Sequence, residues 1–69
     1  MKPVEVIVNG KPGRIVPPLT VAQFIGNAGW KTTQVVVEYN GVVLPRHRLT
    51  ETTLTEGDRL EVVVPVAGG

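Results

Sequence analysis

The sequence predicts an α+β fold in which a mixed sheet of about five strands packs on one main helix. Two features indicate this fold. Apolar, β-branched runs lead into the pairs Asn9-Gly10 and Asn40-Gly41, and such pairs are the strongest short signal for a β-hairpin. Between the two hairpins, apolar residues recur at helical spacing. We expect one domain over residues 1–65, followed by a flexible C-terminal tail over residues 66–69.

The N-terminal hairpin is expected over residues 4–16. Val4–Val8 is rich in β-branched residues, and Asn9-Gly10 supplies two residues that tolerate positive φ. The return strand should cover residues 11–16. Because Pro12 cannot donate a hydrogen bond to a neighbouring strand, we expect this return strand to lie at an edge of the sheet.

The helix is expected to begin just after Thr20, which is a suitable N-cap. Gln23 lies three residues further on and completes a capping box. Leu19 and Phe24 stand at the two positions of a hydrophobic staple, one before the cap and one four residues after it. Together these residues predict both where the helix begins and how the chain enters it.

One face of this helix should be buried, because its apolar residues follow the spacing i, i+3, i+4, i+7. These residues are Val21, Phe24, Ile25 and Ala28. Gly29 is placed to end the helix. Trp30 follows directly, and we expect it to cover the core; the alternative is an aromatic residue that binds a ligand.

The second half of the chain predicts three further strands. In order, we expect a strand over 35–39, a turn at 40–41, a strand over 42–44, a polar connection over 46–56, a turn at 56–58 and a last strand over 59–64. Leu49 and Leu54 should anchor the polar connection to the core. The first and last strands are the most continuously apolar, so we expect them in the centre of the sheet. If they pair in parallel, the helix crosses over one face.

The composition excludes several kinds of function. The chain has no serine and no cysteine, and His47 is its one histidine, so Ser or Cys nucleophiles, disulfides and histidine-cluster metal sites are ruled out. A net charge of +1 disfavours nonspecific nucleic-acid binding and a polybasic membrane anchor. We find no signal region and no apolar run long enough to span a bilayer. We therefore expect a cytoplasmic protein that binds neither nucleic acid nor membrane.

The charged residues are most simply interpreted as solvated surface. Glu5 and Glu61 could be neighbours on adjacent central strands, but strand alternation places such charges outside, and we do not interpret them as an acid/base pair. His47 lies between Arg46 and Arg48. We interpret these three residues as an ordinary solvated loop; the alternative is a small positive spot that meets an acidic partner. No metal and no cofactor is expected to bind to this chain itself.

The C-terminal tail, Val66-Ala67-Gly68-Gly69, is the most informative feature. Its last two residues have no Cβ, so the chain has minimal width there. When extended, the tail reaches about 13 Å at roughly 3.3 Å per residue, enough to thread a narrow tunnel and present the carboxylate of Gly69 inside another protein. A carboxylate that attacks the α-phosphate of ATP becomes an acyl-adenylate, from which sulfur can displace AMP to leave a thiocarboxylate. The alternative is that the terminal Gly-Gly has no function.

On this order of elements, the chain resembles the ThiS/MoaD superfamily of sulfur carriers. Four stretches carry the resemblance and span nearly the whole chain: Val4–Gly10, the helix start Thr20-Val21, Val36–Arg46, and Glu56–Val63 leading to Gly68-Gly69. The Asn-Gly-x-x-Leu-Pro-Arg segment and the Glu-Gly-Asp turn are most similar to the ThiS group. The resemblance implies a β-grasp (ubiquitin-like) fold, in which the sheet half-encloses the helix.

The resemblance also implies a function and a set of partners. A ThiF-type adenylating enzyme would bind ATP and Mg²⁺ and adenylate Gly69. A persulfide-bearing donor would supply the sulfur, and thiazole synthase would receive it in thiamine biosynthesis. Val66, Ala67 and Gly68 would thread the active site of the partner. The chain would then be a protein co-substrate rather than an enzyme, with the ATP site in its partner.

The sheet face away from the helix is the candidate docking surface. Strand alternation places Ile7 and Val63 on the same face as Arg59, Glu5 and Glu61. Apolar residues among charges on an open face suggest a docking patch. The alternatives are a second buried layer or a contact between two copies of the chain.

Three alternative functions stay open on the sequence. The same tail chemistry would serve a sulfur carrier for molybdopterin, for cysteine or for tRNA thiolation. A ubiquitin-like modifier that forms isopeptide bonds with lysines would carry a similar tail. The third alternative is an interaction domain whose tail is inert.

Overall fold

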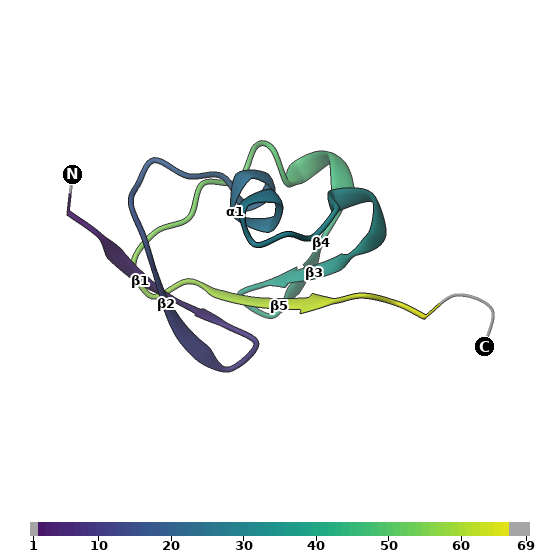
Figure 1. Cartoon of the computed structure of the whole chain (residues 1–69), viewed down its shortest axis with the longest axis horizontal. Helices are drawn as coiled ribbons and strands as arrows, with labels where there is room; N and C mark the ends of the chain where they lie inside the picture. The colour runs from purple at the N-terminus through teal and green to yellow at the C-terminus, as the bar shows by residue number, and fades with distance from the viewer. Residues whose placement is uncertain (1, 67–69) are drawn as a thin grey trace.

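The structure, a computed structural model, describes residues 2–66. Its elements run β1 Val4–Val8, β2 Lys11–Ile15, α1 Val21–Asn27, η1 Thr32–Gln34, β3 Val36–Tyr39, β4 Val42–Leu44, η2 Arg46–Arg48 and β5 Arg59–Val63, where η marks a 3-10 helix. One 5-stranded mixed sheet packs on α1 (Figure 1). The predicted α+β, β-grasp architecture is therefore confirmed, whereas the two 3-10 helices were not predicted.

The strands lie in the order β2-β1-β5-β3-β4. β1 and β5 pair in parallel, with Ile7 opposite Arg59, and every other pair of neighbours is antiparallel. The first and last strands are therefore paired inside the sheet, and the strand that carries Pro12 lies at its edge, as predicted. A parallel pair requires a crossover connection, and α1 belongs to that connection and lies over one face of the sheet (Figure 1).

Both Asn-Gly pairs form the predicted two-residue turns. Asn9 and Gly10 have φ of 51° and 81°, and Asn40 and Gly41 have φ of 52° and 87°. Two successive residues with positive φ match a type I′ turn, whose twist agrees with that of the two flanking strands. The local sequence thus determines the register of each hairpin, with Val8 opposite Lys11 and Tyr39 opposite Val42.

The helix begins with the predicted capping box. The Gln23 main-chain N–H donates to Thr20 Oγ1 at 3.1 Å, and the Thr20 N–H donates to Gln23 Oε1 at 2.9 Å. The next two free N–H groups, of Val21 and Ala22, donate to carbonyls of the connection after η2, at Thr52 and Leu49. The helix start is therefore tied both to its own side chains and to the loop that passes over it.

The helix ends one residue earlier than the burial prediction required. Gly29 has φ of 92°, and the N–H of Trp30 donates to the carbonyl of Ile25 at 3.1 Å, which closes a Schellman motif. Ala28 is thus the C-cap and is exposed, so its predicted place on the buried face was wrong. Ala28 keeps a helical conformation, and its N–H still donates to the Phe24 carbonyl at 3.0 Å. The i+7 prediction fails because this residue lies at the end of the helix, where it lines an open groove and not the core. Gly29 ends the helix as predicted.

The core lies between α1 and the covered face of the sheet. Its buried residues are Val6, Ile15, Val21, Ile25, Val35, Val37, Leu49, Leu54, Leu60 and Val62. Leu49 and Leu54 are 2% and 1% exposed, so both predicted anchors of the connection are confirmed. Trp30 is half-buried and packs against this cluster, in agreement with its predicted covering role.

Candidate functional site

The predicted tail leaves the fold at the end of β5. Val62 is buried in the core, while residues 64–66 continue beyond the strand and Val66 is 89% exposed. Ala67, Gly68 and Gly69 lie outside the described residues, so their predicted role stays a prediction. The structure defines the root of the tail, by which we mean residues 63–66 (Figure 1).

The side chain of Asn9 holds β5 next to the tail root. The Val62 N–H donates to Asn9 Oδ1 at 2.7 Å, and Asn9 Nδ2 donates to the Val62 carbonyl at 3.3 Å. The main chain of β1 reaches β5 only as far as the bond from the Asn9 N–H to the Leu60 carbonyl, at 2.9 Å. The Asn9 amide therefore continues the parallel ladder by one step toward the tail. The sequence predicts Asn9 as a turn residue and gives no indication of this second role.

Asn40 holds the other end of β5 in a similar way. Its main-chain N–H donates to the Arg59 carbonyl at 2.8 Å, and its Oδ1 accepts from the Arg59 N–H at 2.8 Å. Its Nδ2 donates to Asp58 Oδ1 at 3.1 Å. Both hairpin asparagines thus bind the backbone of the strand from which the tail emerges.

Asp58 is a buried carboxylate, 7% exposed, at the start of β5. Its Oδ2 accepts from the Thr55 N–H at 2.8 Å, from the Thr55 hydroxyl at 3.2 Å and from the Tyr39 hydroxyl at 2.9 Å. Burial alone raises the pKa of this carboxyl, but the hydrogen bonds from Thr55, Asn40 and Tyr39 outweigh it, so the pKa of Asp58 lies below its ordinary value. All its partners belong to the turn and its neighbouring strands, so we interpret Asp58 as structural.

The same carboxylate helps to raise the pKa of Tyr39, whereas the pKa of Asp58 itself is lowered. Burial, the hydrogen bond to Asp58 and the negative charge of Asp58 all raise the pKa of the Tyr39 hydroxyl. The hydroxyl therefore stays protonated and remains a donor. No buried side-chain nitrogen or oxygen within residues 2–66 lacks a hydrogen-bond partner.

The open face of the sheet carries the predicted apolar and charged mixture. Ile7 lies opposite Arg59, and Val63 is 54% exposed beyond it on β5, while Leu60 and Val62 face the core. The prediction that Ile7, Val63 and Arg59 share the uncovered face is confirmed. The structure adds Val36, which lies opposite Val63 on β3 and is also exposed. An exposed apolar pair, Val63 and Val36, therefore lies at the start of the tail root.

Glu5 and Glu61, which the sequence allowed as neighbours but which we interpreted as solvated surface, are both exposed and are not paired. Because Ile7 is opposite Arg59, Glu5 and Glu61 lie at different levels of the parallel pair, and Glu61 is opposite Glu38 instead. Parallel register depends on the crossover connection, which the strand sequences alone do not determine. Among residues 2–66 there is also no group of three or more His, Asp or Glu that could hold a metal ion.

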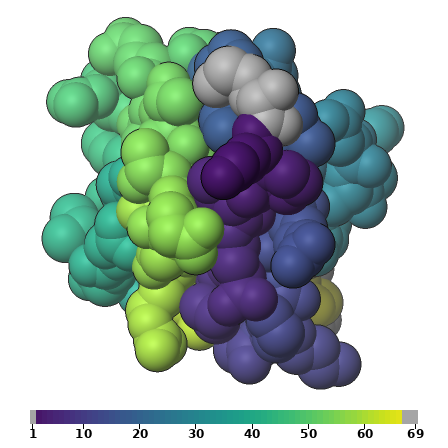
Figure 2. Space-filling view, turned by 90° about the vertical axis from the view of Figure 1, so that its left-hand side faces the viewer, coloured from purple at the N-terminus to yellow at the C-terminus, as the bar shows by residue number. Residues whose placement is uncertain are grey.

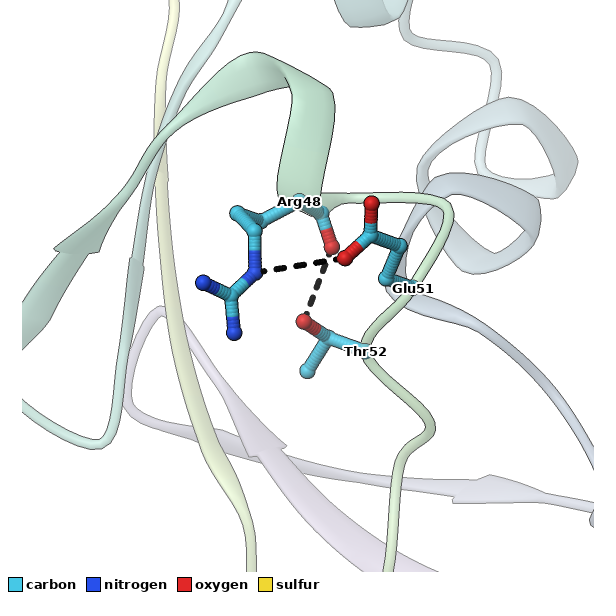
Figure 3. Close-up of polar contacts among 3 residues, drawn as sticks. All are labelled: Arg48, Glu51 and Thr52. Atoms are coloured by element: carbon cyan, nitrogen blue, oxygen red, sulfur yellow. Dashed lines mark hydrogen bonds and ion pairs between the residues drawn. The ribbon is translucent and has the colours of Figure 1, made fainter.

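Of the basic residues of η2, Arg46 lies close to the tail root. Arg48 Nε is 3.5 Å from Glu51 Oε1, and Thr52 Oγ1 donates to the Arg48 carbonyl at 2.8 Å (Figure 3). Arg46 Nε donates to the Thr32 carbonyl at 3.1 Å. Arg46 also lines a hollow of about 460 Å³ together with Val64 and Pro65 of the tail root. One side of the tail root is therefore apolar, and another carries the positive charge of Arg46. Whether His47 contributes to a contact with an acidic partner stays a prediction.

No helix within residues 2–66 combines the length and the apolar character that a membrane span requires.

Comparison with protein families gives one match that covers nearly the whole chain. The family model described as the ThiS family matches residues 6–69. The matched stretch includes the tail root and the terminal Gly-Gly.

Two solved structures share the fold. The crystal structure of the thiamine biosynthesis protein ThiS from Geobacter metallireducens has a TM-score of 0.82 and 32% identity, and the match covers 96% of this chain and 100% of that one. A solution structure of a thiamine biosynthesis protein from the same organism has a TM-score of 0.79 and 32% identity, covering 96% and 88%.

Curated relatives include a larger protein and one of similar length. A thiazole synthase of Paramagnetospirillum magneticum is 28% identical over 65 residues, which are 94% of this chain but only 20% of that protein. The uncharacterized protein ycf40 of Pyropia yezoensis is 29% identical over 66 residues, 96% of this chain and 93% of that protein. The chain thus resembles both a small separate protein and one part of a large one.

Proposed function

Because this chain belongs to the ThiS family, we propose that it is a sulfur carrier that bears a thiocarboxylate on Gly69 and donates its sulfur for thiazole formation in thiamine biosynthesis. The observation that carries this proposal is the tail root. The chain leaves a central strand of the sheet at Val63, and Val66 is 89% exposed. A terminal Gly-Gly beyond such a root could enter another protein while the folded domain remains outside.

The chemistry needs no catalytic group from this chain. In the first step, an oxygen of the Gly69 carboxylate attacks the α-phosphate of ATP, pyrophosphate leaves, and an acyl-adenylate forms. In the second step, the terminal sulfur of a persulfide adds to the carbonyl carbon and AMP leaves, which gives an acyl disulfide. In the third step, a thiol attacks the outer sulfur of this S–S bond, forms a disulfide with it and releases the thiocarboxylate of Gly69. The adenylating partner would bind ATP and Mg²⁺, and a persulfide-bearing partner would supply the sulfur.

Thiazole synthase is the proposed acceptor of the sulfur. The resemblance of the whole chain to about one fifth of a thiazole synthase supports this assignment, because there the two units would belong to one polypeptide. We propose that the chain meets thiazole synthase as a separate protein and presents the thiocarboxylate of Gly69 to it.

We further propose that the adenylating enzyme docks on the open sheet face beside the tail root. Ile7, Val63 and Arg59 would form the contact, with Val36 extending its apolar part. Val63 is the first residue of the tail root, so a partner that covers it would also control the direction in which the tail leaves. Charged side chains among apolar ones would favour one orientation of the two proteins.

The first test is the intact mass of the protein after incubation with ATP, Mg²⁺, a ThiF-type adenylating enzyme and sulfide. We expect a mass gain equal to the exchange of one oxygen for sulfur. The variant that lacks Gly69 should show no gain, and neither should a reaction without ATP. No gain in the folded protein with several such enzymes would contradict the proposed function.

The second test addresses the docking face. Val63→Asp should strongly reduce adenylation while the protein stays folded, because a charge would be buried at the contact. Val42→Asp is the matched control, since Val42 is 67% exposed on the edge strand β4 and outside the proposed contact. Equal adenylation of the two variants would rule out the proposed docking face, as would loss of the fold in Val63→Asp.

A further inference from the structure

Arg46 is held at the start of η2 from two directions. The Leu49 N–H donates to the Arg46 carbonyl at 3.2 Å, and Leu49 is itself buried in the core. The Arg46 side chain reaches η1, where its Nε donates to the Thr32 carbonyl at 3.1 Å. A guanidinium group is planar, so a bond at Nε also restricts the plane of its two terminal nitrogens. Arg46 therefore has a defined place although it is exposed.

The terminal nitrogens of Arg46 have no partner among residues 2–66. The bond to Thr32 is the one hydrogen bond that this side chain makes to a described residue, and the one ion pair in the same part of the chain joins Arg48 to Glu51. Arg46 thus offers a fork of N–H donors that matches the two oxygens of a carboxylate. Arg48, two residues further on, already has a carboxylate partner.

The hollow that Arg46 lines adjoins two parts of the proposed contact surface. Its volume is about 460 Å³, and its walls include Val64 and Pro65 of the tail root. Val36, which belongs to the exposed apolar pair on the open sheet face, lines it as well. Arg46 is the one charged residue among the lining residues. A single positive charge therefore lies where the tail leaves the fold and the proposed docking face begins.

The position of the hollow indicates what covers it, provided that the proposed carrier function holds. The protein that receives the tail has to close around the tail root, and the tail root is one wall of the hollow. The opposite end of the molecule, which faces the viewer in Figure 2, would stay uncovered. A guanidinium group that is covered loses water, so an anionic group of the partner has to replace that water.

A carboxylate side chain fits this role better than a phosphate of ATP. When the tail is extended, the Gly69 carboxylate and the α-phosphate that it attacks lie about 13 Å from Pro65, at roughly 3.3 Å per residue. The nucleotide is thus held at the far end of the tail, while Arg46 lies at its root. The anion that meets Arg46 therefore has to come from the surface of the partner protein.

Two carboxylates of this chain lie further back on the same sheet. Glu38 and Glu61 are exposed and opposite each other on β3 and β5, one level behind the pair Val36 and Val63. Two residues of a strand separate the two levels, which is roughly 7 Å. Neither glutamate forms an ion pair with Arg46. The sign of the charge thus changes from negative to positive toward the tail, and a partner carboxylate shifted back by one level would be repelled.

We propose that Arg46 is a positioning residue, which binds a carboxylate side chain of the adenylating partner and so sets how far the tail enters that partner. Arg46 and the tail root line one hollow, so a partner group fixed on Arg46 is also fixed relative to the tail. The change of sign between Arg46 and the two glutamates favours one register of the two proteins. Arg46 does not touch the reacting atoms, and it lies outside the strands that carry the proposed docking face.

The first test follows pyrophosphate release from ATP and Mg²⁺ with a ThiF-type enzyme while the concentration of the full chain is varied. Arg46→Gln should lower kcat/KM at least about tenfold, mainly through KM, because the attraction at the contact is lost. Added salt should lower kcat/KM of the wild-type chain and should have much less effect on Arg46→Gln. Arg46→Lys, which keeps the charge but not the fork, should lie between the two.

Arg48→Gln is the matched control, because Arg48 belongs to the same 3-10 helix and does not line the hollow. We expect its kcat/KM and its salt dependence to equal those of the wild-type chain. Urea unfolding reports whether each variant is folded. A purely structural role of Arg46, through its bond to Thr32, would change the urea midpoint but not the salt dependence of adenylation.

A cross-link identifies the group that Arg46 meets. A carbodiimide joins an amine to a carboxylate in contact with it, so the lysine introduced by Arg46→Lys should become linked to an Asp or Glu of the adenylating enzyme. Mass spectrometry of the digested complex locates the link. The wild-type chain, which has no amine at this position, should lack it.

Four outcomes would overturn this proposal. They are equal kcat/KM for Arg46→Gln and Arg48→Gln, equal salt dependence of Arg46→Gln and the wild-type chain, a link to Gly69 of the same chain or to a second copy in place of the enzyme, and a link that forms only with thiazole synthase. The absence of any pyrophosphate release from the wild-type chain would overturn the proposed function as well. The four outcomes leave that function intact, so the two proposals can fail separately.

Discussion

The two Asn-Gly hairpins have the same backbone conformation but different surroundings. Asn9 and Asn40 have nearly equal φ, 51° and 52°, and each places its side-chain amide on the backbone of β5. Asn9 binds Val62, near the point where the tail leaves. Asn40 binds Arg59 and the buried carboxylate of Asp58, at the opposite end of the strand.

Because of this difference, we expect the two asparagines to contribute to different properties, Asn40 to the stability of the fold and Asn9 to the way the tail is presented. Asn40 belongs to a hydrogen-bond network around a charged group. When one donor of this network is removed, the buried carboxylate of Asp58 lacks a hydrogen bond that it cannot replace with water. Asn9 makes two bonds between neutral groups, which contribute less. We therefore expect changes around Asn40 to affect mainly the free energy of unfolding, and changes at Asn9 to affect mainly how the tail is held.

Asp58→Ala should produce the largest loss of stability. The change leaves donors of Tyr39, Asn40 and Thr55 without their common acceptor, and we expect a loss of about 3 kcal/mol in the free energy of unfolding. Urea unfolding at neutral pH measures it. Glu51→Ala is the control, because the Arg48–Glu51 ion pair is exposed and should contribute at most about 1 kcal/mol. Equal losses would mean that Asp58 is not the centre of a network.

Acid should remove part of the same stabilisation. The folded pKa of Asp58 is lowered, so its contribution is present above the unfolded pKa of about 3.9 and is lost as the pH falls through the folded pKa. We expect the urea midpoint of the wild-type protein to fall more steeply in this range than that of Asp58→Asn. The loss should be smaller than in Asp58→Ala, because a protonated carboxyl still fills the site. Parallel pH profiles for the two proteins would contradict the assignment.

Local sequence predicted those parts of the fold that depend on neighbouring residues. The turns at Asn9 and Asn40, the capping box at Thr20 and the end of the helix at Gly29 all follow from chemistry within a few residues. The central position of β1 and β5 followed from their apolar sequences. The exposure of Ala28 was missed, because a periodic pattern does not show how far the buried face extends toward the end of the helix.

Interactions between distant segments could not be predicted in this way. The bonds from Asn9 to Val62 and from Asn40 to Asp58 depend on the register of β5, which is set by the crossover connection. The same register separates Glu5 from Glu61. For the candidate site, strand alternation correctly placed Ile7, Arg59 and Val63 on one face but gave no indication that Arg46 would lie beside the tail root.

Asn40→Gly should reduce stability by about 2 kcal/mol. Glycine accepts positive φ, so the turn is preserved and only the side-chain bonds to Asp58 and Arg59 are lost. The loss should be roughly halved when Asp58 is already alanine, because the bond to Asp58 no longer exists in that background while the bond from the Arg59 N–H remains. A double-mutant cycle by urea unfolding measures this coupling, and simple additivity would contradict a shared network.

Asn9→Gly should have the smallest effect on stability, about 1 kcal/mol, because it removes two bonds between neutral groups while the turn is preserved. Its effect on the tail should be the larger one. Without the amide, the Val62 N–H and C=O lose their partner on β1, and the direction of the tail root is less restricted. We therefore expect a slower thiocarboxylation of Gly69 in Asn9→Gly than in Asn40→Gly, measured by intact mass at a temperature where both variants are fully folded. The opposite order of rates would show that stability, and not the hold on Val62, determines how well the tail is presented.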